Sequence, residues 1–547
     1  MTFDYIIVGS GAAGSVMANR LTEDPNNNVL VLEAGGSDWH PVNLVPKGFY
    51  FTMSDPKYVK NFQTEPFGSD GGTEPWTRGR VIGGSTTVNG MVWNRGWAPD
   101  YDSMEAAGNP GWNWDTFRSA YRSIEDHQLG ASEVRGTGGP VGVSVAGPRE
   151  TISDAFISSA GDLGMAYQAD LNGSDDERVG YVPSNVKNGL RVSAARAFLR
   201  PAMKRPNLTV IDRAEVGTIL FDDTRAIGVR AQHKGRVEDF HATKEVLLAG
   251  GALDTPLLLE RSGIGDPAVL HAAGVTLRVD SPNVGNRLLE HRGSSFQYSA
   301  QGADGYNKQL ASALKQGLTG VKYLQERDGV MSFGGYNVLF FFKADPNSDR
   351  PDTQGFFTPI SIAAASLTSA KVSVEQAPGM MLLTYPLRPT SHGSIHITGA
   401  LPSNKPKVVP NFLATEHDRR LVALAGHRVR ELMSQGEITR YMREENRPGP
   451  SVSTDEQFIE NAHNRGGSGY HTLGTAAMGP NDDDVVDSRL RVRGTEGLRI
   501  IDASVFPHMP SGNNNAPTQA LAWHAAKLIQ EDNSPAGRAS AEVAASR

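Results

Sequence analysis

Short apolar runs separated by polar turns mark the beginning of the chain. Residues 4–8 (DYIIV) are apolar and branched, which predicts a strand buried in a parallel sheet. Apolar side chains recur at helical spacing over 13–21, and the polar run 24–28 (DPNNN) is typical of a turn. A second apolar run, 29–33 (VLVLE), predicts another buried strand that ends in Glu33. Strand, helix and strand in this order predict a βαβ unit of an α/β fold.

A different pattern occupies the second half of the chain, where apolar runs alternate with turns over short distances. It predicts strands over 337–343, 354–360, 379–387 and 393–398, which suit an antiparallel sheet with one face roofing a pocket. Helical periodicity over 418–433 predicts a helix that covers the sheet. Five phenylalanines fit either an aromatic pocket or the sheet core, and the core is the favoured interpretation: Phe340, Phe341, Phe342, Phe356 and Phe357.

The first predicted turn, GSGAAG at 9–14, has the spacing of a dinucleotide-binding motif. Gly9 permits the tight turn, Gly11 lets the backbone approach a pyrophosphate, and Gly14 lets the helix pack close to the sheet. The helix N-terminus supplies free N–H groups for phosphate. Glu33 follows Gly14 by 19 residues, where a carboxylate accepts hydrogen bonds from ribose hydroxyls and repels the 2′-phosphate of NADP. An ordinary glycine-rich turn is the alternative, and the motif alone does not separate FAD from NAD.

Composition narrows the possible classes of protein. A length of 547 residues predicts two to four domains. The 53 basic and 60 acidic side chains give a net charge of −7, which argues against nucleic acid as a partner. The chain has no cysteine, which excludes disulfides, thiolate metal sites and cysteinyl cofactor links, and no metal is predicted. No apolar run reaches the ~18–20 residues of a membrane span, and the N-terminus lacks a signal pattern, so a cytoplasmic location is expected.

Two longer motifs make the sequence more specific. Residues 79–96 (GRVIGGSTTVNGMVWNRG) resemble the first signature of the glucose–methanol–choline (GMC) oxidoreductases, and residues 251–265 (GALDTPLLLERSGIG) resemble the second. Weaker family-like stretches lie at 193–201, 283–291 and 497–507. The resemblance implies an α/β fold in which a Rossmann-like FAD-binding domain is interrupted by a substrate domain built on an antiparallel sheet. The implied ranges are 1–155, 193–297 and 465–531 for FAD, 156–192 and 298–464 for substrate, and a loose tail at 532–547.

The resemblance also implies which residues hold FAD. Gly83 and Gly84 would let the backbone approach the cofactor, and Ser85 and Asn89 offer short polar side chains. Asp502 resembles the family residue near the ribityl chain and phosphates, although it is also interpretable as a buried carboxylate that caps a loop. The full predicted set is Gly9, Gly11, Ala12, Ala13, Gly14, Glu33, Ala34, Arg80, Gly83, Gly84, Ser85, Asn89, Gly90, Val92, Val216, Asp502, Ala503 and Pro517.

Val88 departs from part of the family. Members that bind flavin covalently through histidine carry the attached His before Asn89, where this chain has Val88. We therefore expect non-covalent FAD.

The resemblance implies a catalytic pair near the C-terminus. The stretch 470–479 (YHTLGTAAMG) places the active-site histidine at His471, and the N-x-N spacing in 511–529 places its partner at Asn515, with Asn513 as the less favoured candidate. A neutral imidazole takes the alcohol proton, an amide donates to the forming alkoxide, and hydride passes to flavin N5. The asparagines also suit a plain helix start. A helix beginning near Pro517 would favour negative charge on the reduced ring.

Several functions fit these motifs. The favoured one is an alcohol oxidase that uses O2 and forms H2O2. A dehydrogenase with a quinone or other acceptor remains open. An FAD-containing hydroxynitrile lyase is a remote alternative, and the pair of His471 and Asn515 argues against a non-catalytic FAD-binding protein. Val88 and an asparagine partner favour a primary aromatic or furanic alcohol, with choline-type and sugar-type substrates as alternatives. Gly469 is expected to leave room for oxygen or a bulky substrate. The sequence predicts no oligomeric state.

Overall fold

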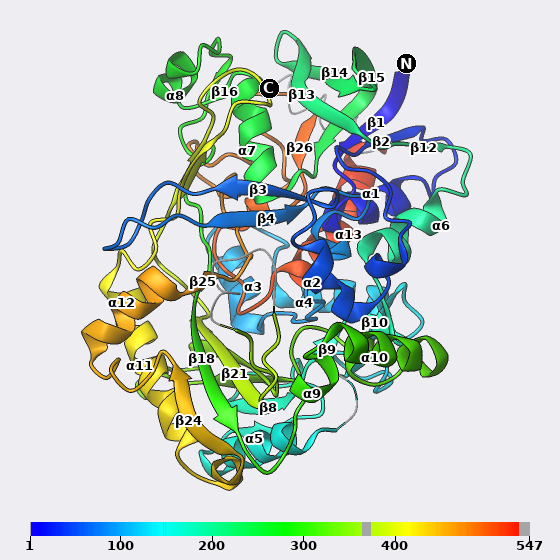
Figure 1. Cartoon of the computed structure of the whole chain (residues 1–547). Coiled ribbons are helices and arrows are strands. Elements are labelled where there is room, and N and C mark those ends of the chain that lie inside the picture. The colour runs from blue at the N-terminus through cyan, green and yellow to red at the C-terminus, as the bar shows by residue number, and fades with distance from the viewer. Residues whose placement is uncertain (1, 146, 148, 364–372, 535–547) are drawn as a thin grey trace.

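The computed structural model describes residues 2–145, 147, 149–363 and 373–534, and two large sheets organise them (Figure 1). The first sheet lies in the upper half of Figure 1 and begins at the N-terminus. Its strand order is β12 (Leu208–Ile211), β2 (Val29–Leu32), β1 (Thr2–Val8), β15 (Arg236–Leu248), β14 (Arg225–His233) and β13 (Ala214–Asp222), and β26 (Leu498–Ile500) also pairs with β15.

Parallel pairing at the centre of this sheet confirms the two predicted buried strands. β1 runs parallel to both β2 and β15, and Ile6, Ile7 and the whole of β2 are buried. Branched apolar side chains suit such strands because both faces are covered. Two long helices, α1 (Ala12–Leu21) and α13 (Asn515–Asp532), pack against each other. Both contribute apolar side chains to the same core as the strands.

The second sheet lies in the lower half of Figure 1. Its order is β24 (Met442–Arg447), β18 (Arg292–Ala300), β21 (Gly379–Pro386), β20 (Thr353–Thr358), β19 (Val338–Phe342), β8 (Arg178–Tyr181) and β7 (Ala166–Tyr167), and β25 (Gly467–Ser468) pairs with β18. Only β7 and β8 pair in parallel within it. Three of the four predicted strands, β19, β20 and β21, therefore lie side by side in an antiparallel sheet as expected.

The fourth predicted strand was assigned to the wrong sheet. Residues 393–398 form β22 (Ser394–His396), which pairs with β23 (Lys407–Val409) in a separate two-stranded sheet. Its backbone is held by the segment around Gly285, whose carbonyl accepts from the N–H of Ile395 at 2.8 Å. A local apolar pattern therefore predicts that a segment is a strand, but it does not predict which strand pairs with it.

Helices α5 (Thr151–Asp162), α11 (Glu416–Met433) and α12 (Asp455–Arg465) enclose the core of the second sheet, and α11 confirms the predicted covering helix. Phe340, Phe342 and Phe357 belong to this core, where Phe357 stacks on Phe156 with ring centroids 4.3 Å apart. Phe341 packs edge-on against Trp97 in a neighbouring core. The core interpretation is confirmed for these phenylalanines, whereas Phe356 also lines the cavity described below.

The remaining helices and strands are shorter or peripheral. The helices are α2 (Phe49–Thr52), α3 (Ala98–Ala106), α4 (Trp114–Ile124), α6 (Arg200–Ala202), α7 (Gly251–Arg261), α8 (Pro267–Ala272), α9 (Asn307–Leu310) and α10 (Ala313–Glu326). The strands are β3 (Val59–Gln63), β4 (Pro75–Gly79), β5 (Glu125–His127), β6 (Val141–Val145), β9 (Pro183–Ser184), β10 (Val186–Lys187), β11 (Leu190–Arg191), β16 (Ile264–Gly265) and β17 (Val279–Asp280). Across the described part of the chain, no helix is long and apolar enough to cross a membrane. Most of the predicted tail, 535–547, lies outside the described residues.

Candidate active site

A cavity of about 410 Å³ lies where segments of the first sheet meet the face of the second. Its walls include the predicted cofactor residues Gly9, Gly11, Ala12, Ala13, Glu33, Ala34, Arg80, Gly84, Ser85, Asn89, Gly90, Val92, Val216, Asp502 and Ala503, and both catalytic candidates, His471 and Asn515. Gly14, Gly83 and Pro517 do not line the cavity. From the second sheet, Phe356, Leu383 and Tyr385 complete the cavity.

The turn after β1 has the close backbone packing that its glycines were predicted to allow. Gly9 has a φ of +101°, and a Cβ on it would lie 2.5 Å from the carbonyl oxygen of Ala249. A Cβ on Gly14 would lie 1.9 Å from the carbonyl oxygen of Gly9, so only glycine lets the helix sit this close. No side chain caps the N-terminus of α1. Its first N–H groups therefore remain available to an anion such as a pyrophosphate.

A second glycine turn meets the first across the cavity floor. It leads into the 3₁₀ turn η3 (Gly84–Thr87). Gly83 and Gly84 both have positive φ, and a Cβ on Gly84 would lie 2.8 Å from the Cα of Gly11. The N–H of Gly83 donates to Ser10 Oγ at 3.2 Å. The two motifs recognised separately in the sequence thus form one backbone cradle.

Glu33 and Asp502 are buried carboxylates at the rim of this cradle. Glu33 accepts from Ser10 N–H at 3.0 Å, Ser10 Oγ at 2.6 Å and Gly35 N–H at 2.8 Å, and burial raises its pKa. A carboxylate has about four acceptor sites, so capacity remains for a ribose hydroxyl. Asp502 accepts from Ser504 and from Gly251 N–H at the start of α7. Asp502 therefore caps a loop and also borders the cavity.

His471 is held on both sides of its ring. Its Nδ1 lies 2.8 Å from His291 Nδ1, and its Nε2 lies 2.8 Å from the Nδ2 of Asn513. His291 Nε2 lies 3.0 Å from the carbonyl oxygen of Leu387, which can only accept, so His291 carries its proton on Nε2. Its bare Nδ1 accepts from His471 Nδ1–H. His471 Nε2 therefore carries no proton, and its lone pair accepts from the Asn513 NH2 group.

Burial keeps this histidine neutral. Burial, with the neighbouring His291 and Arg78, holds the pKa of His471 well below its usual range, and burial lowers the pKa of His291 to about 4. Glu290 accepts from the N–H groups of His471 and His291 at 2.7 and 2.9 Å and from Thr472 Oγ1 at 2.6 Å. His291 and Glu290 were missed as site residues, although the family-like stretch 283–291 ends in this pair.

The structure separates the two asparagine candidates. Asn513, the less favoured one in the sequence, faces His471. Asn515 instead donates to Asn185 Oδ1 at 3.0 Å and accepts from Gln519 Nε2 at 3.0 Å. Asn515 still lines the cavity, at the first residue of α13. The NH2 group and the oxygen of its amide are therefore both engaged away from the histidine.

The space over Gly469 differs from the expectation. A Cβ on this residue would lie 2.9 Å from both His291 Cβ and His471 Nδ1, so the histidine pair fills the direction that a side chain would take. The expected room for oxygen or a bulky substrate is therefore absent in that direction. Tyr470, between Gly469 and His471, has a φ of +60° although it is not glycine. Such backbone strain clusters at functional sites.

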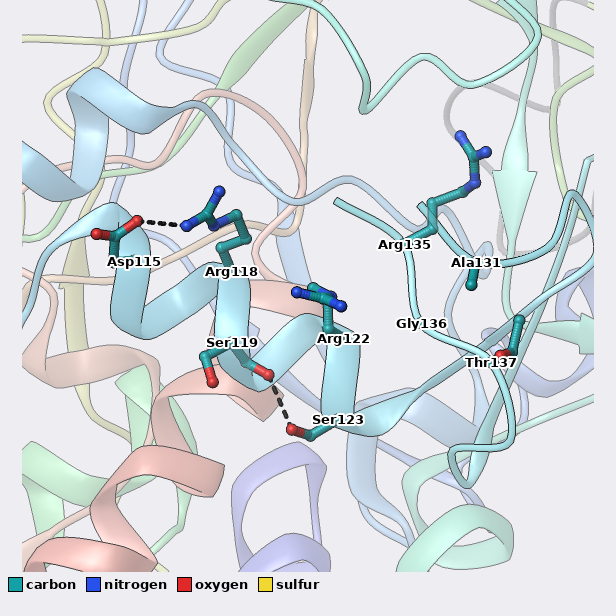
Figure 2. A pocket seen from close by; sticks show the side chains of 9 residues that line it. All are labelled: Asp115, Arg118, Ser119, Arg122, Ser123, Ala131, Arg135, Gly136 and Thr137. Atoms are coloured by element: carbon teal, nitrogen blue, oxygen red, sulfur yellow. Dashed lines mark hydrogen bonds and ion pairs between the residues drawn. The ribbon is translucent and has the colours of Figure 1, made fainter. Parts of the chain in front are cut away.

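A second hollow, of about 440 Å³, lies on α4 and the loop after it (Figure 2). Arg118 points toward Asp115 there, at 2.8 Å, while Arg122 projects from α4 and Arg135 from the loop (Figure 2). None of the predicted cofactor or catalytic residues lines it. The cavity at His471 is therefore the candidate active site.

The fold and the cavity define a dinucleotide-binding α/β protein whose neutral histidine and amide face one buried pocket. Comparison with known families refines this class: models described as GMC oxidoreductase match residues 3–292 and 389–522. The chain belongs to the GMC oxidoreductase family. It is an FAD-dependent oxidoreductase that acts on CH–OH donors.

Individual relatives agree with the family over nearly the whole chain. The chain is 35% identical over 533 residues to an oxygen-dependent choline dehydrogenase of Photobacterium profundum, covering 96% of this chain and 93% of the relative. It is 34% identical to an alcohol dehydrogenase [acceptor] of Pseudomonas putida, covering 96% and 95%. Among solved structures, pyridoxine 4-oxidase from Mesorbium loti superposes with a TM-score of 0.87 at 27% identity, covering 97% of this chain and 99% of that one.

Proposed function

We propose that the protein oxidises a neutral primary alcohol of aromatic or furanic type to its aldehyde, with His471 as the base. The observation that carries the proposal is the bare Nε2 of His471, which faces the amide of Asn513 at 2.8 Å in the cavity. A neutral imidazole at this position can accept the hydroxyl proton of an alcohol. The Asn513 NH2 group, already pointing there, can donate to the oxygen as negative charge develops.

The cradle residues fit FAD. Uncapped N–H groups at α1 face the cavity, a Cβ on Gly84 would clash with the backbone of Gly11, and Glu33 has acceptor capacity left. When bound, FAD supplies the hydride acceptor at flavin N5. Val88 is a buried side chain that cannot form a bond to a flavin, so we propose that FAD is held without a covalent link.

Aromatic side chains dominate the part of the cavity that we assign to substrate. The aromatic wall consists of Phe49, Tyr336, Phe356 and Tyr385, and the rings of Tyr336 and Phe356 stack with centroids 4.4 Å apart. Such a wall favours a flat apolar substrate through burial and ring packing.

Choline carries a positive charge and an apolar alcohol does not, so the acidic side chains of the cavity bear on which of the two it binds. Four acidic side chains line the cavity among the described residues, and each has another partner. Asp254 pairs with Lys60 at 2.6 Å and Glu215 with Arg80 at 3.0 Å, while Glu33 and Asp502 accept from the backbone and hydroxyl groups already described. With the remaining acceptor capacity of Glu33 assigned to the ribose of FAD, a trimethylammonium group would find no other carboxylate among these four without a partner.

Choline is the second candidate, and two observations favour it. Several relatives at 34–36% identity are choline dehydrogenases, and aromatic faces can hold a quaternary ammonium without a carboxylate. For the electron acceptor we propose O2, with H2O2 as product. The named relatives include both oxygen-dependent and acceptor-dependent enzymes.

The test follows the visible absorption of the bound flavin without oxygen while alcohols are added. We expect bleaching by benzyl and furfuryl alcohol, and faster bleaching by 3,3-dimethyl-1-butanol than by choline, because these two have the same shape and differ in charge. Admission of air should restore the colour rapidly and form peroxide.

Other outcomes of the same experiment select other functions. Faster bleaching by choline than by its neutral analogue would overturn the proposed substrate class. A slow return of colour would overturn O2 as acceptor and favour a dehydrogenase. A dithionite-reducible flavin that no alcohol bleaches would contradict the proposed reaction.

A further inference from the structure

A buried glutamine on a strand of the second sheet, Gln354, makes a hydrogen bond to Asn513. Gln354 lies on β20, two residues before Phe356 and opposite Tyr385 in the β20–β21 register, so all three share the face that roofs the cavity. Its side chain is fully buried. Gln354 Nε2 donates to Asn513 Oδ1 at 3.0 Å.

The glutamine amide is itself held in one direction. Asn94 Nδ2 donates to Gln354 Oε1 at 3.4 Å, and the same Asn94 nitrogen donates to the carbonyl oxygen of Ser511 at 3.1 Å. Asn94 Oδ1 accepts from Gly96 N–H at 3.2 Å. Backbone groups thus fix which end of the Asn94 amide donates and which accepts. Because Asn94 donates to Gln354 Oε1, Gln354 presents its NH2 group to Asn513 Oδ1, and this fixes the orientation of the Asn513 amide.

The turn before Asn513 is shaped around this chain of amides. Gly512 has a φ of +117°, and a Cβ on it would lie 1.7 Å from Asn94 Nδ2 and 2.6 Å from Gln354 Oε1. Only glycine leaves the space that the two side chains occupy. The backbone at Gly512 therefore leaves room for the hydrogen bond between Asn94 and Gln354.

We propose that Gln354 is a positioning residue that orients the Asn513 amide so that its NH2 group faces Nε2 of His471. The proposal rests on the function assigned above to His471 and Asn513. If the amide turned over, Oδ1 would face Nε2 and would favour a proton on that nitrogen. His471 Nδ1 would then be bare and would face the bare Nδ1 of His291 at 2.8 Å. Gln354 thereby keeps Nε2 in the form that can accept a proton.

The kinetic test compares Gln354→Glu, Gln354→Met and Asn513→Ala with the double variant Gln354→Met/Asn513→Ala. Glutamate has the same shape but can only accept, and methionine keeps the volume without a donor. We expect the limiting rate of flavin reduction by saturating alcohol to fall about 10- to 100-fold in each Gln354 variant, with little change in the apparent Kd of the alcohol. The double variant should be no slower than Asn513→Ala alone, because Gln354 acts through Asn513.

A second measurement does not depend on turnover. In holoenzyme with ¹⁵N-labelled histidine, the His471 signal, identified by its loss in His471→Asn, should report a proton on Nδ1. In Gln354→Glu the carboxylate would draw the Asn513 NH2 group to itself, and we expect the proton to move to Nε2. The matched control is Thr358→Val, at the other end of β20. It removes the hydrogen bond that the Thr358 side chain donates to Asn337 and should leave both readouts unchanged.

The outcomes distinguish this proposal from the proposed function. Independent, multiplicative losses in the double variant, or an unchanged His471 tautomer in Gln354→Glu, would overturn the positioning role. If no alcohol reduces the wild-type flavin, the proposed function fails, and the tautomer measurement alone still decides the role of Gln354. Should Gln354→Glu fail to fold, the isosteric Gln354→Met decides through the double variant.

Discussion

Protonation of His471 is disfavoured at both nitrogens of its ring. Nδ1 already donates to His291, and Nε2 faces a donor, the amide of Asn513. A proton added to Nε2 would meet this NH2 group in a site where burial already lowers the pKa of His471. The base is therefore ready at neutral pH without a carboxylate partner.

The two asparagines should differ in their effect on catalysis. We expect Asn513→Ala to lower the limiting rate of flavin reduction about 100-fold, because the developing alkoxide loses its amide donor. Asn515→Ala should have a much smaller effect on that rate, since its amide bonds to Asn185 and Gln519. Anaerobic stopped-flow reduction of both variants checks this, with FAD content as the control for folding. The reverse order would restore the assignment that the N-x-N spacing favours.

Sequence motifs locate the histidine but not the orientation of its partner. His471 and the glycines of the cradle lie in short sequence motifs, and their roles depend on the local backbone geometry of those motifs. The run 513–515 contains three identical side chains, so composition cannot decide which one faces the base. That choice depends on Gln354 and Asn185, which are more than 150 residues away in the chain.

At the scale of elements, apolar patterns predict strands and helices better than they predict pairing. β1, β2, β19, β20, β21 and α11 arise where periodicity places them, because burial of one face or both is already visible in the residues. β22 is equally visible but joins another sheet, since its partners lie at Gly285 and β23. The proposed division into FAD and substrate domains stays a prediction.

The turn η3 has a consequence for cofactor attachment. It is followed by Val88, which packs in a small apolar cluster with Tyr58, Val59 and Val81. We expect acid precipitation of the holoenzyme to leave all of the flavin in the supernatant, because no nucleophilic side chain stands at this position. Absorption spectra of pellet and supernatant measure the split, and free FAD added to the apoprotein serves as control. Yellow colour retained on washed pellet would contradict non-covalent binding.

At the scale of the whole molecule, buried histidines make the fold sensitive to acid. Burial lowers the pKa of His127, His291 and His524 to about 4, below the ordinary value of about 6.5. Between these values the unfolded chain binds more protons than the folded one, so the free energy of unfolding falls as pH drops. Each such histidine contributes a slope of up to about 1.4 kcal/mol per pH unit.

His127 offers the cleanest test of this sensitivity. It is buried, and its Nε2 has no hydrogen-bond partner among the residues that the structure describes. We expect His127→Leu to reduce the loss of stability between about pH 6.5 and about pH 4, by up to about 1.4 kcal/mol per pH unit at the steepest point. Urea unfolding across this range measures it, with an exposed-histidine variant, His427→Gln, as control. An equal slope in wild type and His127→Leu would show that His127 does not titrate on unfolding.

The aromatic wall and the histidine network meet at one residue, Tyr385, whose ring stacks on His291 with centroids 4.3 Å apart and lies edge-on to His471. The other three wall residues are held by contacts outside the network. His471, the residue that receives the proton, donates hydrogen bonds to Glu290 and His291 and accepts one from Asn513. Ring stacking holds Tyr336, and Phe49 lies against Gly335, where a Cβ would come within 3.1 Å of its ring. Substitutions at Phe49, Tyr336 or Phe356 can therefore change which substrate binds without disturbing the base, whereas a substitution at Tyr385 would alter both.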